Sequence, residues 1–283
     1  MPTIGLFHST VRAEEKLIIR AAREKKAGIK LIDIRNEVFN PLHYRPDFDI
    51  ALERSVSTVK GGYATEFLEA LGAVVINPSG VARICEDKFL TSLALQKTGV
   101  PTLKFAMAFS LEQAMAAVAD LGGFPVVVKP PLGSWGRMLA KVNDRDSLEA
   151  IIEHKDVLGS PQQKAYYLQE YIQKPGRDIR SFVVGGETIC AIYRTSSHWI
   201  TNTALGGKAT NCPVTKELSQ LSLQAAKAVK GGILAIDIIE TSEGLKVNEI
   251  NHTMEFKNSE EPTGVSISGA IVDYCLQKIN SND

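Results

Sequence analysis

Three side chains in the C-terminal part of the sequence carry oxygen atoms within strand-like runs that are otherwise largely apolar. Glu249 and Asn251 lie two residues apart in LKVNEIN, and residues i and i+2 of a strand point to the same face. Asp237 lies in ILAIDIIE, where a buried carboxylate is costly unless it is paired or bound to a metal. Each of them alone could be a paired structural group. Together they form the oxygen-rich set that Mg²⁺ prefers beside nucleotide phosphates, and we predict a magnesium site here.

A lysine and a glycine-rich loop place positive charge and adaptable backbone in the middle of the chain. Lys129 ends the apolar run PVVVK, and lysine is rarely buried without an anionic partner. The N–H groups of the following loop could close over phosphates, and Arg137 adds a fixed positive charge. The loop consists of Gly133, Ser134, Trp135 and Gly136. The alternative is a lysine that extends to solvent from an edge strand beside an ordinary loop.

Two further segments combine polar side chains with apolar runs. The first could bind the amino group of a purine through a carboxylate or a backbone carbonyl, or could be a surface strand end. It consists of Gln169, Glu170, Tyr171 and Ile172. In the second, Asp178 and Arg180 share one face of a strand, and Arg194 ends the next apolar run. Arginine forks suit carboxylates and phosphates, although solvated ion pairs are also common here.

Composition excludes several broad classes of function. The chain has 283 residues, enough for two or three domains, and its 32 Lys and Arg balance its 32 Asp and Glu. A formal net charge of zero provides no global field that would recruit nucleic acid or an anionic membrane. No apolar run approaches the ~20 residues of a membrane span. The four cysteines are widely spaced, which indicates buried thiols rather than a zinc site. We expect a soluble, cytoplasmic protein that binds neither nucleic acid nor membrane.

Alternating apolar runs and helical periods predict the elements that would position these residues. Over the first 80 residues, short strands alternate with helices, which favours a parallel, doubly wound sheet. No G-x-G-x-x-G motif marks a dinucleotide site there. A single helix is then predicted over 77–99, ending at Gly99 before Pro101. Further along, Gly185-Gly186 predicts a hairpin turn between two strands, and 263–279 reads as a closing helix.

The order of the motifs along the chain is similar to that of a known superfamily of enzymes. Over essentially the whole chain, the sequence resembles the ATP-grasp ligases. The motifs that carry the resemblance are DK at 87–88, VVKP at 127–130, GSWGR at 133–137, QEY at 169–171, DIR at 178–180, YR at 193–194, Asp237 and NEIN at 248–251. The resemblance implies an α/β fold of three domains, over 1–84, 85–166 and 167–283. ATP would lie between the central and C-terminal domains.

The resemblance also implies a role for each motif. Lys88 and Lys129 would contact the nucleotide phosphates beneath a loop over 133–139. Residues 169–172 would hold adenine, and Asp178 would face the ribose. The groups that meet the transferred phosphate or the substrate carboxylate would be Arg180 and Arg194, with Asn202 beside them. Two Mg²⁺ ions would be bound by Asp237, Glu249 and Asn251.

Within the superfamily, the segments GSWGR, QEYIQKPGRDIR, HWITNTALGG and NHTMEFKN resemble the LysX-type ligases of lysine biosynthesis. These enzymes attach 2-aminoadipate to the carrier protein LysW, and the related ArgX-type ligases use glutamate. In the aminoadipate type, an Asn and a small residue follow the EFK element, as Asn258 and Ser259 do here. The amino acid would be contacted by Arg194, Asn251, Asn258, Ser259, Thr263 and Gly264.

The resemblance implies a two-step ligation through an acyl phosphate, with ATP and Mg²⁺ as cofactors and no protein nucleophile. The partners would be a LysW-type carrier, 2-aminoadipate and further copies of the chain in a dimer or tetramer. One alternative is a ligase that adds glutamate to LysW, in the arginine branch, or to another protein tail. A second is a binding protein that has lost catalysis, but such a protein could dispense with metal ligands such as Asp237 and Glu249.

Overall fold

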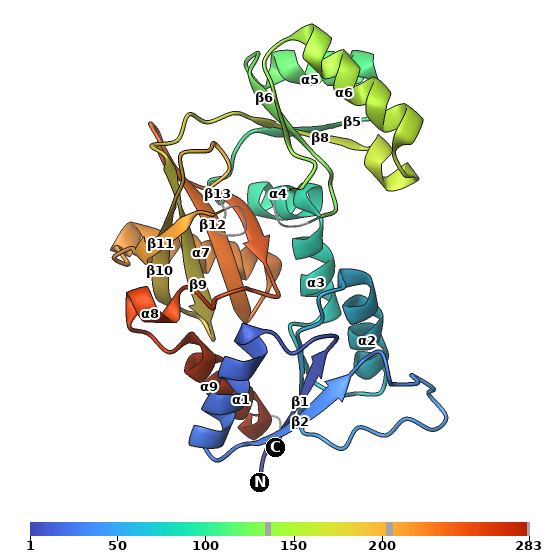
Figure 1. The fold of residues 1–283 in the computed structure, drawn as a ribbon, viewed down its shortest axis with the longest axis vertical. Coiled ribbons are helices and arrows are strands. Elements are labelled where there is room, and N and C mark those ends of the chain that lie inside the picture. The colour runs from blue at the N-terminus through green and yellow to red at the C-terminus, as the bar shows by residue number, and fades with distance from the viewer. Residues whose placement is uncertain (134–136, 202–205, 282–283) are drawn as a thin grey trace.

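Three β-sheets follow one another along the chain, and helices join or cover them (Figure 1). The computed structural model describes residues 1–133, 137–201 and 206–281. In Figure 1 the first sheet lies at the bottom and the second at the top, with the third to the left of the helices that connect them. No helix in the described ranges is long and apolar enough to cross a membrane.

The first sheet is parallel throughout, in the order β2-β1-β3-β4, which confirms the parallel sheet predicted from sequence. Its apolar runs form a buried centre that two helices help to cover. The strands are β1 (Thr3–His8), β2 (Gly28–Asp33), β3 (Ile50–Glu53) and β4 (Val75–Ile76), and the helices are α1 (Ala13–Glu24) and α2 (Thr58–Ala70).

The single helix predicted over 77–99 is wrong, because two helices occupy this segment. α3 (Ser79–Glu86) ends where α4 (Lys88–Lys97) begins, and Asp87 separates them. The Asp87 carboxylate accepts hydrogen bonds from the backbone N–H groups of Phe89 and Leu90, at 2.8 and 3.1 Å. It therefore caps a new helix, and the Lys88 N–H donates to the Pro131 carbonyl instead of continuing the old one.

The second sheet is antiparallel, in the order β5-β8-β6-β7. Its strands are β5 (Phe105–Ala108), β6 (Val126–Lys129), β7 (Ala140–Val142) and β8 (Tyr166–Glu170). The accompanying helices are α5 (Leu111–Asp120), α6 (Arg145–Leu158) and the 3₁₀ helix η1 (Pro161–Lys164). β8 pairs with β5 and β6, so a domain limit at residue 166 would cut this strand from its sheet.

The third sheet is antiparallel, in the order β11-β10-β9-β12-β13. Gly185 and Gly186 join β9 to β10 with positive φ angles of 62° and 93°, which confirms the predicted hairpin. The strands are β9 (Arg177–Val184), β10 (Glu187–Thr195), β11 (Lys208–Asn211), β12 (Ile233–Thr241) and β13 (Gly244–Asn251). The helix α7 (Lys216–Val229) packs against this sheet.

The closing helix predicted over 263–279 begins later than expected. A short helix, α8 (Glu260–Thr263), ends at Gly264, which has a φ of 68°, and α9 (Ile267–Asn280) starts after the Ser266 hydroxyl caps it. The left-handed backbone at Gly264 interrupts the helix. α9 packs against α1, so the end of the chain returns to the first sheet (Figure 1).

Candidate active site

A cavity of about 740 Å³ lies between residues of all three sheets. This volume falls within the range of about 300–1,000 Å³ typical of ligand sites. It collects predicted residues that are far apart in sequence. Those that line it are Lys129, Gly133, Gln169, Glu170, Tyr171, Ile172, Asp178, Arg180, Arg194, Asp237, Glu249 and Asn251.

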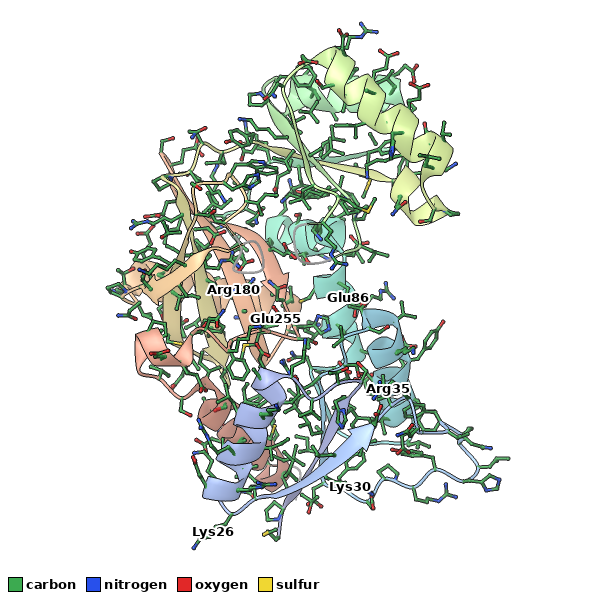
Figure 2. All side chains as sticks on the ribbon, viewed as in Figure 1. Lys26, Lys30, Arg35, Glu86, Arg180 and Glu255 are labelled. Atoms are coloured by element: carbon green, nitrogen blue, oxygen red, sulfur yellow. The ribbon has the colours of Figure 1, made fainter. Side chains whose placement is uncertain are left out.

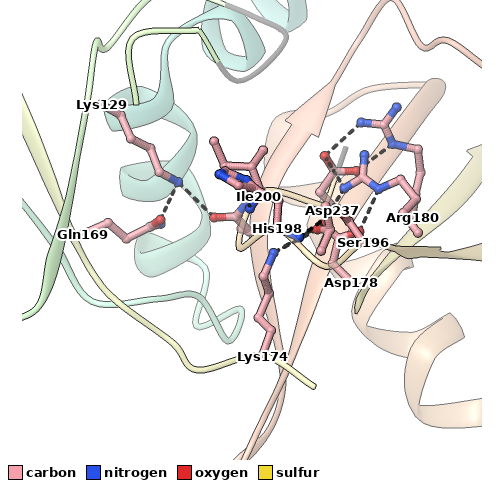
Figure 3. Close-up of polar contacts among 12 residues, drawn as sticks. Lys129, Gln169, Lys174, Asp178, Arg180, Ser196, His198, Ile200 and Asp237 are labelled. Carbon is pink, nitrogen blue, oxygen red and sulfur yellow. Dashed lines mark hydrogen bonds and ion pairs between the residues drawn. The ribbon is translucent and has the colours of Figure 1, made fainter. Parts of the chain in front are cut away.

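Lys129 is buried, as the apolar run before it predicted, and its partners are neutral. Its Nζ donates to Gln169 Oε1 at 2.5 Å and to Asn248 Oδ1 at 3.1 Å (Figure 3). Burial lowers the pKa of Lys129 to about 8, and Lys88 lowers it further, while Glu249 opposes the change. Because both partners are amides, the charge of the ammonium is not neutralised by either, and the group is available for an anion.

Lys88, the first residue of α4, is also buried. Its Nζ donates to the Gly133 carbonyl at 2.6 Å and lies 4.0 Å from Glu249 Oε1. It thus links the beginning of the glycine-rich loop to the carboxylate on β13. Arg137 is exposed and is not among the residues lining the cavity. Ser134, Trp135 and Gly136, which were predicted to cover phosphates, lie outside the described residues.

The segment predicted to hold adenine lies along one side of the cavity. Gln169 is buried beside Lys129, and the Glu170 carboxylate accepts a hydrogen bond from the Lys104 N–H at 2.8 Å. Lys141 Nζ lies 3.9 Å from the centre of the Tyr171 ring. The Glu170 side chain is therefore already engaged by the backbone of the neighbouring segment.

Arginines and aspartates on β9, β10 and β12 form a continuous ion-pair cluster. Arg180 donates to both Asp237 oxygens at 2.7 and 2.9 Å, and Arg194 donates to both Asp178 oxygens at 2.7 and 2.8 Å. Arg194 also lies 3.1 Å from Asp237. Burial would raise the pKa of Asp237, but the two guanidinium groups outweigh it and hold the pKa at about 2. Asp237 is therefore charged, and the two aspartates orient both arginine forks.

Lys174 extends this cluster and was not anticipated from the sequence. Its Nζ donates to Thr201 Oγ1 at 2.8 Å and lies 3.9 Å from Asp178 (Figure 3). Burial lowers the pKa of Lys174, and Asp178 opposes this. The residue follows the predicted adenine segment in a loop, where a lone lysine carries no signal of burial. Asn202, which was predicted nearby, lies outside the described residues.

The three predicted metal ligands come together on neighbouring strands. Asp237 on β12 lies opposite Glu249 on β13, and Asn251 lies two residues further along. The amide nitrogen of Asn251 is buried without a hydrogen-bond partner. Within the described ranges, no three His, Cys, Asp or Glu side chains gather as a metal site, so this set offers two carboxylates and one amide. Such oxygen donors beside nucleotide phosphates fit Mg²⁺.

A β-bulge on β13 adds Asn248 to the site, which strict alternation of side chains does not predict. The register passes from Asp237–Glu249 to Ile238–Val247, so Asn248 has no partner of its own on β12. A bulge turns an extra side chain toward one face of the sheet. As a result Asn248 and Glu249 both line the cavity although they are adjacent in sequence.

The predicted amino-acid contacts divide into two groups. Asn258 and Ser259 line a small cavity with Arg180, Arg194 and Lys257, and both arginines also line the main cavity. Ser259 is buried and Asn258 is exposed. In the second group, the Thr263 hydroxyl donates to the Ser259 carbonyl at 2.6 Å, and Gly264 ends α8. Neither Thr263 nor Gly264 is among the residues that line these two cavities.

Sequence reasoning also missed a wall of the cavity that comes from the first sheet and its loops. These residues carry polar groups but no motif, and only the folding of the chain brings them opposite β13. They include Ser9, Thr10, Arg12, Glu53, Ser55, Ser57 and Lys60, together with Glu86 of α3 and His252 after β13. Figure 2 labels Glu86 and Glu255 on facing sides of this region.

The fold and the cations and carboxylates around this cavity define an ATP-grasp ligase, an enzyme that uses ATP to form a carbon–nitrogen bond. A RimK domain ATP-grasp protein from Sphaerobacter thermophilus superposes with a TM-score of 0.80 at 26% identity, covering 96% of this chain and 98% of that chain. D-alanine–D-alanine ligase from Bacillus anthracis shares the fold, with a TM-score of 0.73 at 20% identity and 100% of both chains covered.

The chain belongs to the RimK-like ATP-grasp family, whose domain matches residues 85–275. Residues 4–84 match the LysX preATP-grasp domain. A glutamate–LysW ligase, ArgX, from Sulfurisphaera tokodaii is 38% identical over 276 residues, or 96% of this chain and 97% of the relative. An α-aminoadipate–LysW ligase, LysX, from the same organism is 34% identical over 284 residues, or 98% and 97%. The resemblance seen in the sequence is therefore confirmed.

Proposed function

We propose that this enzyme joins the α-amino group of 2-aminoadipate to the side-chain carboxylate of the C-terminal glutamate of a LysW-type carrier protein, as a step of lysine biosynthesis. The observation that carries the proposal is one cavity lined by Lys129, the arginine pair and the oxygen donors of β12 and β13. The relatives named as LysW ligases support the acceptor, because they align over nearly the full chain.

In the first step, the carrier carboxylate attacks the γ-phosphorus of ATP, the bond from that phosphorus to the β-phosphate oxygen breaks, ADP leaves, and the carboxylate becomes an acyl phosphate. Lys88 and Lys129 bind the phosphates, and the amide oxygens of Gln169 and Asn248 hold the Lys129 ammonium in place. Preorganised cations of this kind stabilise negative charge that develops on the transferred group. We assign Arg180 and Arg194 to the transferred phosphate or the substrate carboxylate, since both forks line the cavity.

We infer that Asp237, Glu249 and Asn251 would hold Mg²⁺, and that two ions would be bound. The metal would neutralise charge on the phosphates and help to orient them. Asp237 is paired with Arg180 and Arg194 in this structure, so it would share its oxygens between the metal and the guanidinium groups. The buried Asn251 amide has no hydrogen-bond partner for its nitrogen, and it could reorient without breaking one.

The choice of 2-aminoadipate rests on the small side chain of Ser259. Ser259 is 2% exposed and lines the small cavity beside the arginines, where a larger side chain would occupy space. The extra methylene of 2-aminoadipate needs that space, and one methylene in a pocket is worth about 1–3 kcal/mol. Glutamate is the second candidate, because the ArgX relative, at 38% identity, is named for it.

The direct test incubates the enzyme with ATP, Mg²⁺ and a LysW-type carrier, offers each amino acid separately, and reads the intact mass of the carrier. We expect a gain of one 2-aminoadipate residue, slow addition of glutamate, and no adduct once Mg²⁺ is chelated. A preference for glutamate would move the enzyme to the arginine branch while keeping the chemistry. No adduct with either amino acid would refute the proposed acceptor.

A Ser259→Val substitution tests the basis of this choice. Valine fills more of the pocket, so the ratio of kcat/KM for 2-aminoadipate to that for glutamate should fall by about tenfold, which corresponds to about 1.4 kcal/mol. The control is Ser242→Val, at an exposed position outside both cavities in the turn between β12 and β13. An unchanged ratio in a folded Ser259→Val enzyme would remove Ser259 from substrate selection.

A further inference from the structure

Two acidic side chains that line the cavity have no lysine or arginine partner among the described residues. The other lining acids lie within 4.0 Å of a lysine or arginine nitrogen: these are Glu170, Asp178, Asp237, Glu249 and Glu255. Glu53 and Glu86 are the exceptions. Within the described ranges, neither of them forms an ion pair with a lysine or an arginine. A carboxylate facing a cavity without a cation leaves room for a positively charged ligand.

The two acids come from different elements and converge on the same region. Glu53 ends β3, and its carboxylate accepts a hydrogen bond from the Ser55 N–H at 2.6 Å. It also lies against the backbone of α2, since a Cβ added at Gly61 would be 2.8 Å from it. Glu86 ends α3, and its Oε1 lies 3.6 Å from His252 Nε2. Figure 2 shows Glu86 on the side of the cavity opposite Glu255.

A third group at this place is an unused hydrogen-bonding atom. Ser55 is 5% exposed and lines the cavity, and its Oγ makes no hydrogen bond of acceptable geometry. A buried hydroxyl without a partner costs free energy unless a ligand supplies one. Its oxygen can accept a hydrogen bond from an N–H donor. Ser55 lies beside Glu53, and its oxygen therefore offers an acceptor for an N–H donor next to the two carboxylates.

The electrostatic environment of the pair favours a cation that can give up a proton. Burial raises the pKa of Glu53, and burial together with the nearby charge of Glu53 raises the pKa of Glu86. Glu86 is also the last residue of α3, where the helix dipole is negative and attracts a cation. The Ser55 N–H opposes this rise at Glu53, whereas no N–H of the described residues donates to the Glu86 carboxylate. Glu86 is thus the carboxylate of the two that is open to take up a proton.

We propose that Glu53, Glu86 and Ser55 bind the α-ammonium group of the incoming amino acid, and that Glu86 takes its proton before the amine attacks the acyl phosphate. This inference rests on the proposed ligation and deepens it. An amino acid arrives at neutral pH as an ammonium ion, which has no lone pair for attack. Glu53 and the Ser55 hydroxyl position that ion at the cavity wall formed by the first sheet.

The proton balance of the second step is complete with groups already named. The ammonium gives one proton to the Glu86 carboxylate and becomes a neutral amine. Its nitrogen forms a bond to the acyl carbon, and the bond between that carbon and the phosphate oxygen breaks. The second proton of the attacking nitrogen leaves with inorganic phosphate, and the amide keeps one N–H. Glu86 then returns its proton to water after the products depart.

Hydroxylamine separates this step from the first one, because it is largely unprotonated at neutral pH and attacks acyl phosphates without a base. We would measure, for wild type and Glu86→Gln, both ligation of the amino acid and formation of carrier hydroxamate with hydroxylamine. We expect Glu86→Gln to lower ligation by about 100-fold, the lower end of general-base effects, and to leave hydroxamate formation at the wild-type rate. Glu53→Gln should raise KM for the amino acid by about tenfold, which corresponds to about 1.4 kcal/mol for one charged hydrogen bond.

Glu66→Gln serves as the matched control, because Glu66 is an exposed residue of α2 outside the cavity. Equal losses of ligation and hydroxamate in Glu86→Gln would overturn the proposal, since Glu86 would then act in phosphoryl transfer or folding. Unchanged ligation in Glu86→Gln would overturn it as well. A wild-type enzyme that forms neither adduct nor hydroxamate would instead refute the proposed function.

Discussion

At the scale of single residues, burial without a charged partner distinguishes Lys129 from the other cations of the site. Arg180 and Arg194 are neutralised by aspartates, whereas Lys129 meets only the amides of Gln169 and Asn248. A buried ammonium held by neutral acceptors is less stable without a ligand than with one. A bound ATP phosphate would contact the Lys129 ammonium and offset the free energy that is lost when this charge is buried.

Lys129→Met tests this by removing the charge and keeping a side chain of similar length. We expect ATP affinity to fall by at least about tenfold, since one charged contact of about 1.5–3 kcal/mol is lost, while the fold remains. Isothermal titration with ATP and Mg²⁺ would measure the affinity, and circular dichroism the fold. Lys97→Met, an exposed residue of α4, should bind ATP as wild type does. Full ATP affinity in Lys129→Met would mean that Lys129 does not contact phosphate.

The lowered pKa of Lys129 predicts that the stability of the protein depends on pH. The folded-state pKa of about 8 lies below the ordinary value of 10.5, so the unfolded chain binds more protons at Lys129 between these pH values. The free energy of unfolding should therefore gain a contribution that grows from pH 8 to pH 10.5, by up to about 3 kcal/mol. Urea unfolding of wild type and Lys129→Met at pH 7 and pH 10 isolates this contribution. If the difference between the two proteins did not change with pH, Lys129 would not be buried as a charge.

At the scale of elements, the break between α3 and α4 matters more for the site than either helix does. It places Glu86 at the end of one helix and Lys88 at the start of the next, on either side of the Asp87 cap. A continuous helix would rotate residues 86 and 88 by about 200° relative to each other, and α4 could not turn Lys88 toward Gly133. The cap thus positions two residues of the site.

Asp87→Ala should reduce both stability and nucleotide binding. Loss of the cap costs about 1 kcal/mol of unfolding free energy, and frayed helix ends would displace Lys88. Ser110→Ala removes the cap of α5, away from the cavity, and should cost similar stability without affecting ATP affinity. Urea unfolding and ATP titration compare the two variants. Equal ATP affinity in both would show that the break does not position the site.

At the scale of the whole molecule, the first and third sheets share one core, and the buried amide of Asn77 bonds to both strands and loops of the third. Residues of β1 and α1 pack in the same apolar cluster as residues of β9 and α9. The Asn77 side chain donates to the carbonyls of Ile233 and His252 at 2.7 and 2.8 Å, and accepts from Gly232 N and Ile233 N at 3.1 Å. The cavity wall that includes Glu53 is therefore held in place by Asn77. The Asn77 amide fixes this wall against β12 and against His252, the residue that follows β13.

Asn77→Ala should be strongly destabilising, because it leaves several buried backbone groups without partners. Each backbone group left without a partner costs about 1–3 kcal/mol, and water will satisfy some of these groups. We therefore expect the free energy of unfolding to fall by about 3 kcal/mol. Chemical denaturation gives the value, and Asn36→Ala, at an exposed position in the first sheet's loops, should change it by less than about 0.5 kcal/mol. A change in Asn77→Ala as small as in Asn36→Ala would contradict the bridging role.

The sequence alone determined the features that depend on local order along the chain. Apolar runs predicted the strands that carry Lys129, Asp237 and Glu249, the Gly185-Gly186 pair predicted the hairpin after β9, and the order of the motifs identified the ATP-grasp ligases. Only the tertiary structure decided the rest. The bulge at Asn248, the bond from the Lys88 N–H to the Pro131 carbonyl and the wall formed by Glu53, Ser55 and Glu86 depend on pairing and packing between distant segments, and no periodic pattern encodes such contacts.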